Sequence, residues 1–227
     1  GISEPAGSLL SQKLAAPPRT VHGSTHPPAY PRRLAREGYI ALALDYRGYG
    51  ESEGVRGRHR PLEQAQDSYD SVTYLQTLAA VDPDRIGIYG SSFGGANAIW
   101  AGAFDARIKV VVSAVGCGNG EHWLEAVRTP EEWTSFRQRV ADHARDRVLN
   151  NAKEEIYRYD VYPNDLNAVD KPTLTVAEHG SEDVTHVDLA SVDALMRYKP
   201  DWVVDKISPR PVLFFIADED TIAPPEV

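Results

Sequence analysis

A short segment in the first half of the chain, Arg85 to Trp100, constrains the fold most strongly. It reads RIGIYGSSFGGANAIW: an apolar run, then Gly90-Ser91-Ser92-Phe93-Gly94, then small residues in a helical pattern. This is Gly-x-Ser-x-Gly with a predicted strand before it and a predicted helix after it. So tight a turn holds its central serine in strained backbone geometry, and the two flanking glycines are expected to remove clashes. The segment predicts Ser92 as a nucleophile; the alternative is a Gly/Ser-rich turn that only lets helix and strand pack closely.

Apolar runs alternate with helical patterns on both sides of this segment. The predicted strands cover residues 39–46, 85–90, 108–115 and 211–217, and the predicted helices cover a short stretch ending at Gly38, 62–80 and 94–104. Strands that read as continuous apolar runs are typical of parallel sheets buried on both faces. The sequence therefore predicts an α/β fold with a doubly wound, mostly parallel sheet.

The alternation is interrupted by a long insertion. It is rich in Trp, Tyr, Arg and Glu, shows helical spacing at Trp133, Phe136 and Val140, and contains no obvious strand. We expect a helical lid over one face of the sheet. The predicted organisation is an N-terminal part of the core, an insertion and a return to the core, with these ranges: 1–116, 117–207 and 208–227. The proline-rich N-terminal region is predicted as loop, since AAPPRTV is poor strand material.

Composition excludes several classes of function. The net charge of −9 argues against a nucleic-acid partner, and the one basic run, residues 56–60 (RGRHR), is interpreted as a solvated loop rather than an anion site. A single cysteine, Cys117, excludes an internal disulfide and is expected in the core. No apolar run could span a bilayer and no signal-peptide pattern is present, so we expect a cytoplasmic protein without a membrane partner. A homo-oligomer is compatible with the sequence.

A second glycine cluster, Gly48 to Gly54 (GYGESEG), also follows an apolar run and is the alternative place for a dinucleotide site. Its third glycine comes one position too late for Gly-x-Gly-x-x-Gly, and an arginine-rich loop follows instead of a helix. No cofactor is therefore expected. His179 and His186, with Glu182 and Asp183 between them, are interpreted as a polar loop rather than as metal ligands.

Three blocks of the sequence together resemble a known superfamily. LALDYRGYGESEG, DPDRIGIYGSSFGG and PRPVLFFIADEDTIAPPE are similar to α/β-hydrolases, and especially to hydrolases near dienelactone hydrolase and the X-prolyl dipeptidyl peptidase/acyl esterase group. The resemblance covers roughly residues 28–227 and implies a triad in the chain order serine, acid, histidine.

The resemblance assigns the acid to a turn near the C-terminus. Asp220-Thr221-Ile222-Ala223-Pro224 matches the form Asp-x-x-(small apolar)-Pro that carries the acid in this superfamily. Asp220 is the first choice, and the adjacent carboxylates of Asp218 and Glu219 are alternatives. The carboxylate would orient a histidine and stabilise its charged form.

The resemblance does not supply the histidine. All seven histidines precede Asp220, and the superfamily places its own some tens of residues after the acid. We therefore expect the base beyond residue 227 of a longer polypeptide. His122, near the carboxyl end of the third strand, is an alternative in a geometry that the superfamily does not use.

Two backbone N–H groups are expected to bind the oxyanion. Phe93 begins the helix after the nucleophile, where its N–H has no helical acceptor. The resemblance of His22-Gly23-Ser24 to the superfamily's His-Gly-x turn implies Ser24 as the second donor. His122 and Trp123 are candidate pocket residues.

Together these features predict a serine hydrolase that cleaves a carboxylic ester or related acyl bond in a small-molecule substrate through an acyl-enzyme on Ser92. A peptidase or acyltransferase that uses the same serine remains open, and so does a non-catalytic or fragment domain, because no histidine follows Asp220.

Overall fold

The computed structural model describes residues 20–21, 29–50, 52–161 and 186–227. Its centre is a parallel sheet of three strands in the order β3-β4-β7. The strands are β3 (Ile86–Ser91), β4 (Ile108–Ala114) and β7 (Val212–Phe215). The expected strands at 85–90, 108–115 and 211–217 are therefore confirmed, and the crossover from β3 to β4 contains a helix, as parallel pairing requires.

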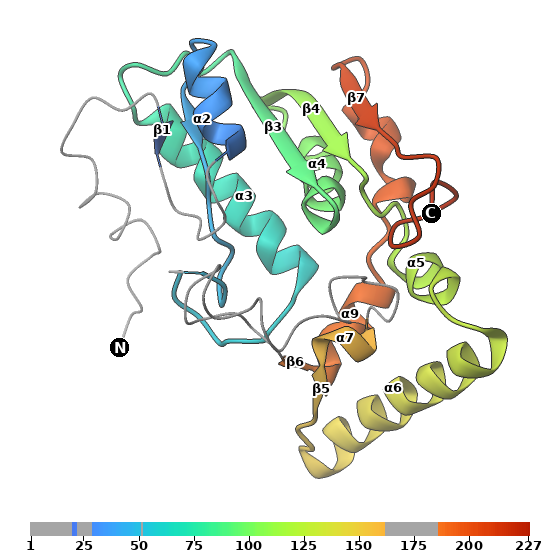
Figure 1. Ribbon diagram of the computed structural model, residues 1–227. Coiled ribbons are helices and arrows are strands. Elements are labelled where there is room, and N and C mark those ends of the chain that lie inside the picture. The colour runs from blue at the N-terminus through green and yellow to red at the C-terminus, as the bar shows by residue number, and fades with distance from the viewer. Residues whose placement is uncertain (1–19, 22–28, 51, 162–185) are drawn as a thin grey trace, which may run out of the picture.

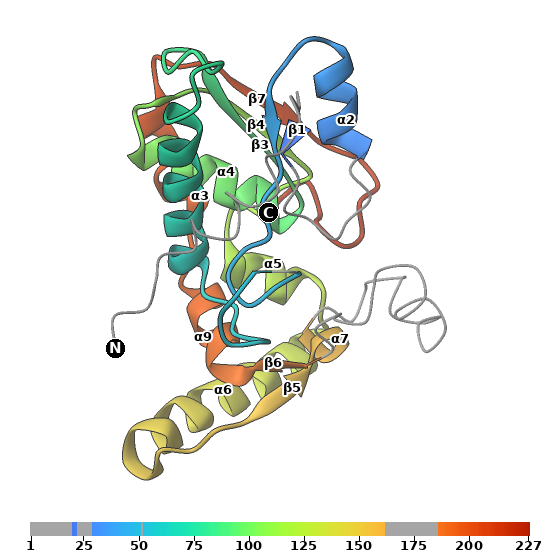
Figure 2. The ribbon, with the colours of Figure 1, turned by 90° about the vertical axis from the view of Figure 1, so that its left-hand side faces the viewer.

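Helices cover one face of this sheet. Helix α4 (Phe93–Phe104) packs directly on β3 and β4, and α3 (Pro61–Gln76) packs on α4 (Figure 2). The approach is close at Gly102, where a Cβ would lie 2.3 Å from Cγ2 of Val111. A buried apolar cluster that includes Ile86, Ile99 and Ile108 fills the interface, so the helix α4 predicted from small-residue spacing forms part of the core.

On the opposite face of the sheet, side chains are more accessible. Tyr89, Val110 and Leu213 are 39%, 38% and 49% exposed in the described structure. The short helix α2 (Ala29–Arg36) lies on this side of the molecule (Figure 2).

The first half of the chain departs from expectation in two places. Only Ala41–Leu42 (β2) of the predicted strand 39–46 is a strand, and it pairs in parallel with Thr20–Val21 (β1) in a separate two-stranded sheet. Residues 43–46 form no strand ladder with the described residues, and the turns of the glycine-rich loop begin after Tyr46, whose carbonyl oxygen accepts from Tyr49 N at 3.0 Å. The expectation that AAPPRTV contains no strand is wrong at its last two residues.

The insertion is mainly helical, as expected, and gathers beneath the carboxyl end of the sheet in Figure 1. Its helices are α5 (Gly120–Ala126), α6 (Pro130–Asn150), α7 (Arg158–Val161) and α9 (Leu189–Met196), followed by the 3-10 turns η3 (Pro200–Trp202) and η4 (Val204–Ile207). Local chemistry fixes the start of α6: Thr129 and Glu132 form a capping box around Pro130, which has no N–H to satisfy.

The expectation that the insertion has no strand is wrong. Strands β5 (Glu155–Tyr157) and β6 (His186–Asp188) form a short antiparallel pair. Each has three residues, too few for a two-residue alternation of apolar and polar side chains to be recognised. Within the described ranges, no helix combines the length and the apolar character that crossing a bilayer requires.

Candidate active site

Ser92 lies at the carboxyl end of β3, at the N-cap of α4, and it is exposed. Its backbone has φ 53° and ψ −127°, a conformation that a non-glycine residue adopts only at a cost of about 1–3 kcal/mol. Two strong backbone bonds hold this turn: Ser92 N donates to Ala114 O at 2.8 Å, and Gly95 N donates to Ser92 O at 2.8 Å. The strained, exposed serine is the geometry expected of a nucleophile elbow.

The two glycines of the motif have different roles. A Cβ on Gly90 would lie 1.8 Å from the carbonyl oxygen of Gly94, so no other residue fits there. A Cβ on Gly94 would meet nothing within 4 Å, and the expectation that both glycines remove a clash is wrong for this position. The second obligatory glycine is instead Gly95, whose Cβ would lie 2.7 Å from Oγ of Ser113 on β4.

A second strained residue lies at the same edge of the sheet. Val115 follows β4 with φ 46°, although it is β-branched, and its N–H donates to Phe215 O at 2.8 Å. Together with the bond from Ser92 to Ala114, this bond extends the strand ladder past the ends of β3, β4 and β7. The strained turn is therefore fixed by its neighbours, and no signal in the sequence identified Val115.

The backbone N–H of Phe93 is free for an oxyanion. Phe93 is the first residue of α4, and within the described residues no acceptor receives its N–H. The positive end of the helix lies at the same point. Ser24, the expected second donor, lies outside the described residues.

Asp220 is fixed in a turn after β7. Its Oδ1 accepts hydrogen bonds from the N–H groups of Ile222 and Ala223 at 2.9 and 2.8 Å, and the residue is half-buried. No hydrogen bond from the described residues reaches Oδ2, which leaves that oxygen for another donor. Asp218 and Glu219 are exposed and accept no hydrogen bond from the described part of the chain. The geometry therefore favours Asp220 over its two neighbours.

The serine and the acid lie at the same edge of the sheet, with one strand between them. Since neighbouring strands are about 4.8 Å apart, the ends of β3 and β7 are separated by about 10 Å, a gap that an imidazole between hydroxyl and carboxylate can bridge. Among the described residues, no histidine bonds to Ser92 or Asp220. His122 is exposed on α5, and its role as a base or pocket residue stays a prediction.

Trp123, the other expected pocket residue, connects the two halves of the site. Its buried indole ring stacks on the Phe93 ring, with centroids 6.4 Å apart and planes at 25°. Its Nε1 donates to the carbonyl oxygen of Ile222, in the turn that holds Asp220, at 2.5 Å. One side chain of the insertion thus contacts the residue after the nucleophile and the turn of the acid.

The basic run at 56–60 is only partly the solvated loop that the sequence suggested: Arg56 and Arg58 are exposed, but His59 packs inward. The His59 ring meets the Phe93 ring edge-on, with centroids 4.4 Å apart and planes at 88°. Burial is the main cause that lowers the pKa of His59 to about 4, and the nearby charges of Arg158 and Arg60 lower it further. Its Nε2 is buried and has no partner in the described structure. The sequence does not indicate the contact between His59 and Phe93, because an arginine-rich run is typical of a solvent-exposed loop.

The same loop is bonded to the insertion. Arg60 pairs with Asp188 at 2.8 Å and donates to Oγ of Ser191 at 2.6 Å, and the His59 N–H donates to the same Oγ at 2.9 Å. Asp188 N also donates to Gly57 O at 3.0 Å. These bonds join the loop before α3 to β6 and α9.

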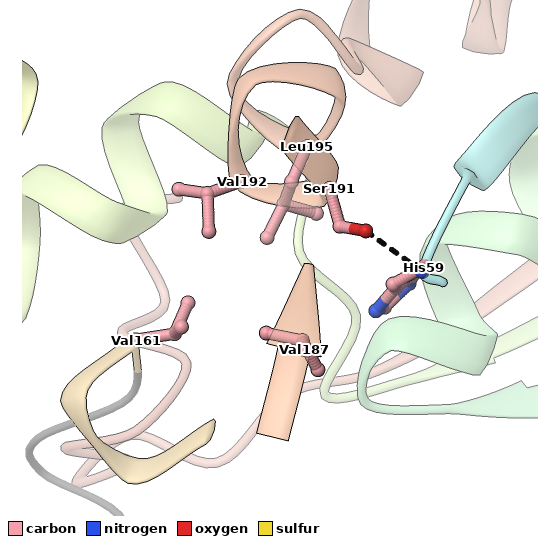
Figure 3. Close-up of a pocket in the computed structure, with 6 residues that line it drawn as sticks. All are labelled: His59, Val161, Val187, Ser191, Val192 and Leu195. Carbon is pink, nitrogen blue, oxygen red and sulfur yellow. Dashed lines mark hydrogen bonds between the residues drawn. The ribbon is translucent and has the colours of Figure 1, made fainter. Parts of the chain in front are cut away.

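A narrow, mostly apolar pocket lies beside His59. Figure 3 shows the imidazole facing Val161, Val187, Val192 and Leu195, with the dashed hydrogen bond from His59 to Ser191 at its rim. These residues belong to α7, β6 and α9, so this pocket lies between the insertion and the loop before α3.

A buried polar chain lies under the first turns of α4. The hydroxyl of Tyr198 donates to Oδ1 of Asn97 at 3.1 Å, and Nδ2 of Asn97 donates to Oε1 of Gln64 at 2.9 Å. Burial raises the pKa of Tyr198, so its phenol stays a neutral donor. The ring of Tyr198 also contacts Phe93, with centroids 5.8 Å apart. Phe93 is thus enclosed by aromatic rings from three segments of the chain.

Metal binding finds no support in the described ranges, which contain no group of three or more His, Cys, Asp or Glu that could hold an ion. His179, Glu182 and Asp183 lie outside these ranges. Cys117 is buried in the core of the insertion, as expected, and burial raises the pKa of its thiol to about 12.

Comparisons with known proteins agree with this fold. A family model described as X-Pro dipeptidyl-peptidase (S15 family) matches residues 5–195. An uncharacterized 31.7 kDa protein of Escherichia coli, from the traX-finO intergenic region, is 28% identical over 199 residues, covering 88% of this chain and 68% of that protein. The thiohydrolase aneE of Aspergillus aculeatus is 42% identical over 79 residues, 34% of this chain and 25% of that one.

Solved structures support the same architecture. The α/β hydrolase GrgF from Penicillium sp. sh18 matches with a TM-score of 0.69 at 24% identity. The match covers 90% of this chain and 72% of the GrgF chain. The expected α/β-hydrolase fold is therefore confirmed.

Proposed function

Because the chain belongs to the X-Pro dipeptidyl-peptidase (S15) family, we propose that it is a serine hydrolase that cleaves an acyl bond through an acyl-enzyme on Ser92. The observation that carries the proposal is the exposed serine at φ 53° on a strand-to-helix turn. A non-glycine residue in that conformation costs free energy, and such strain is typical of functional sites, where here it makes the hydroxyl project from the sheet.

In the proposed reaction, Oγ of Ser92 attacks the acyl carbon while a base accepts the hydroxyl proton. The carbonyl oxygen becomes an oxyanion, which the N–H of Phe93 stabilises together with a second donor. The tetrahedral intermediate expels the alcohol, thiol or amine, which takes the proton from the base, and water then releases the acid from Ser92. Oδ2 of Asp220 would hold the base in its correct tautomer. In the superfamily's chain order, the base is a histidine that comes after the acid.

A carboxylic ester or a thioester is the substrate class we favour. The elbow and the acid turn both contact Trp123, and apolar side chains of the insertion surround Phe93, so the site suits an acyl group of small or medium size. The name of the relative aneE, a thiohydrolase, supports the inclusion of thioesters. Peptidase and acyltransferase activities use the same serine and are the alternatives; a cytoplasmic location and a homo-oligomer stay predictions.

Turnover of matched substrates tests the proposal. We would compare an aryl ester, the corresponding thioester and an Xaa-Pro arylamide, using the purified protein and its Ser92→Ala and Ser91→Ala variants. The proposal expects hydrolysis of the ester or thioester that Ser92→Ala abolishes and Ser91→Ala preserves. Cleavage of the arylamide alone would support the peptidase instead. Ester hydrolysis that survives Ser92→Ala would exclude the proposed mechanism.

A further inference from the structure

We propose that His59 is a positioning residue that couples the position of the insertion to the position of the nucleophile elbow. The proposal rests on the proposed function, since it concerns how Ser92 and the N–H of Phe93 are held for reaction. Its basis is that the insertion and the elbow are in contact with the same short loop.

The first step is the contact between His59 and Phe93. The imidazole edge meets the Phe93 ring at a centroid distance of 4.4 Å, the closest of the ring contacts that Phe93 makes in the described structure. Edge-on aromatic pairs have a preferred geometry that stabilises them beyond simple burial. Because Phe93 follows Ser92 directly, the direction of its side chain and that of its N–H are coupled through one short stretch of backbone.

The second step is the bond between His59 and the insertion. Oγ of Ser191, which is 2% exposed on α9, accepts from the backbone N–H of His59 and from Nη1 of Arg60. Arg60 also forms an ion pair with Asp188, at the N-cap of the same helix. These bonds hold the end of the loop, at His59 and Arg60, against α9.

The third step is the surroundings of the imidazole. Its Nε2 is buried beside a pocket of aliphatic side chains and has no hydrogen-bond partner among the described residues. Because Nε2 makes no hydrogen bond there, a phenylalanine ring should serve at this position as well. What the position uses is a flat ring with an edge, held between α9 and Phe93.

The test compares His59→Ala with His59→Phe. The phenylalanine keeps the ring edge against Phe93, whereas the alanine removes it. We expect His59→Ala to lower kcat for the ester roughly tenfold or more, with KM within about twofold, because misplaced reacting groups lose rate rather than binding. His59→Phe should keep kcat within about threefold of the wild type. The rate of Ser92 labelling by a fluorophosphonate should follow kcat.

A double-mutant cycle tests the connection to the insertion. Ser191→Ala should lower kcat in the wild-type protein and cause little further loss in His59→Ala, since both act through one contact. The matched control is His143→Ala, because His143 is also buried with an unpartnered Nε2, but on α6. It should lower the melting temperature without changing kcat.

Three results would overturn the proposal. Equal losses of kcat in His59→Phe and His59→Ala would show that the nitrogen matters and not the ring. Losses from Ser191→Ala and His59→Ala that multiply would show independent effects. An unchanged labelling rate in His59→Ala, with the wild type labelled, would refute the positioning role alone, whereas a wild type without labelling would refute the proposed function as well.

Discussion

The nucleophile elbow and the insertion that surrounds it are held in place by different means. The elbow is fixed by backbone bonds and by glycines that leave no room for a side chain. A Cβ on Gly90 would lie 1.8 Å from the carbonyl oxygen of Gly94. The insertion is held against the elbow by side chains, through Trp123, Tyr198 and the ion pair of Arg60 with Asp188. A backbone scaffold can tolerate strain at Ser92, while side-chain contacts can adjust to a substrate.

This difference predicts where substitutions act. Changes at the elbow should affect folding and the chemical step together, because the same backbone carries both. Changes in the insertion should affect the rate with smaller losses of stability. The following experiments test this separation.

The largest effect is expected from Asp220→Asn. The amide keeps the turn's acceptor for the N–H groups of Ile222 and Ala223 but cannot stabilise an imidazolium, so kcat should fall about 10³–10⁴-fold with little change in stability. Steady-state kinetics and thermal melts measure both. Asp218→Asn, at an exposed neighbour, is the matched control; an equal loss there would move the acid to another carboxylate.

Gly90→Ala should lower the free energy of unfolding by more than about 3 kcal/mol, since its Cβ would overlap the carbonyl of Gly94. Gly94→Ala should instead be neutral or stabilise by up to about 1 kcal/mol, because Gly94 is helical and its Cβ would enter open space. Urea denaturation compares the two. Similar losses for both would contradict the different roles assigned to these glycines.

Stability should fall as the pH decreases from about 6.5 to about 4. The pKa of His59 is lowered to about 4 in the folded protein, so the unfolded chain, with an ordinary histidine pKa, binds more protons in this window. Above pH 6.5 His59 is neutral in both states and contributes nothing to the pH dependence, and a penalty that grows to roughly 3 kcal/mol develops as the pH falls to about 4.

Several groups surround His59 and enter this prediction. Arg60 and Arg158 add positive charge, and Tyr49, whose pKa burial raises to about 12, stays neutral throughout. Elsewhere in the insertion, the hydrogen bond from Lys199 lowers the pKa of Glu121, and this carboxylate loses its contribution to stability only at lower pH. Urea titrations at several pH values measure how the free energy of unfolding changes with pH. This pH dependence should be weaker in His59→Phe; an unchanged pH dependence in that variant would assign the effect to another group.

The smallest effect is expected from Trp123→Phe. Phenylalanine keeps a ring against Phe93 but cannot donate to Ile222 O, so the free energy of unfolding should fall by about 1 kcal/mol. Because the turn that holds Asp220 loses this hydrogen bond, kcat should fall several-fold. A fluorophosphonate should still label Ser92. A drop in stability without any change in kcat would mean that this hydrogen bond does not position Asp220.

The core could be predicted from the sequence because its signals are local. The apolar runs of β3, β4 and β7, the helix α4 and the Gly-x-Ser-x-Gly turn each fall within a few consecutive residues, and each was predicted within a few residues of its bounds. The choice of Asp220 followed from a resemblance and agrees with its bonded, half-buried turn.

What could not be predicted depends on contacts between distant segments. His59 and Ser191 are 132 residues apart in sequence, and nothing in RGRHR indicates that its histidine packs on Phe93. Gly94 and Gly95 look equivalent in the motif, and only the packing of α4 on β4 shows which one is obligatory. The three-residue strands β5 and β6 are too short to show a pattern.

The most direct test of the central claim is the site of covalent labelling by a fluorophosphonate, read by intact mass and peptide mapping. The account predicts one adduct on the peptide that contains Ser92, absent in Ser92→Ala and retained in Ser91→Ala. No adduct on a folded polypeptide that includes a histidine after the acid, or an adduct that maps to another residue, would contradict the assignment of Ser92 as the nucleophile.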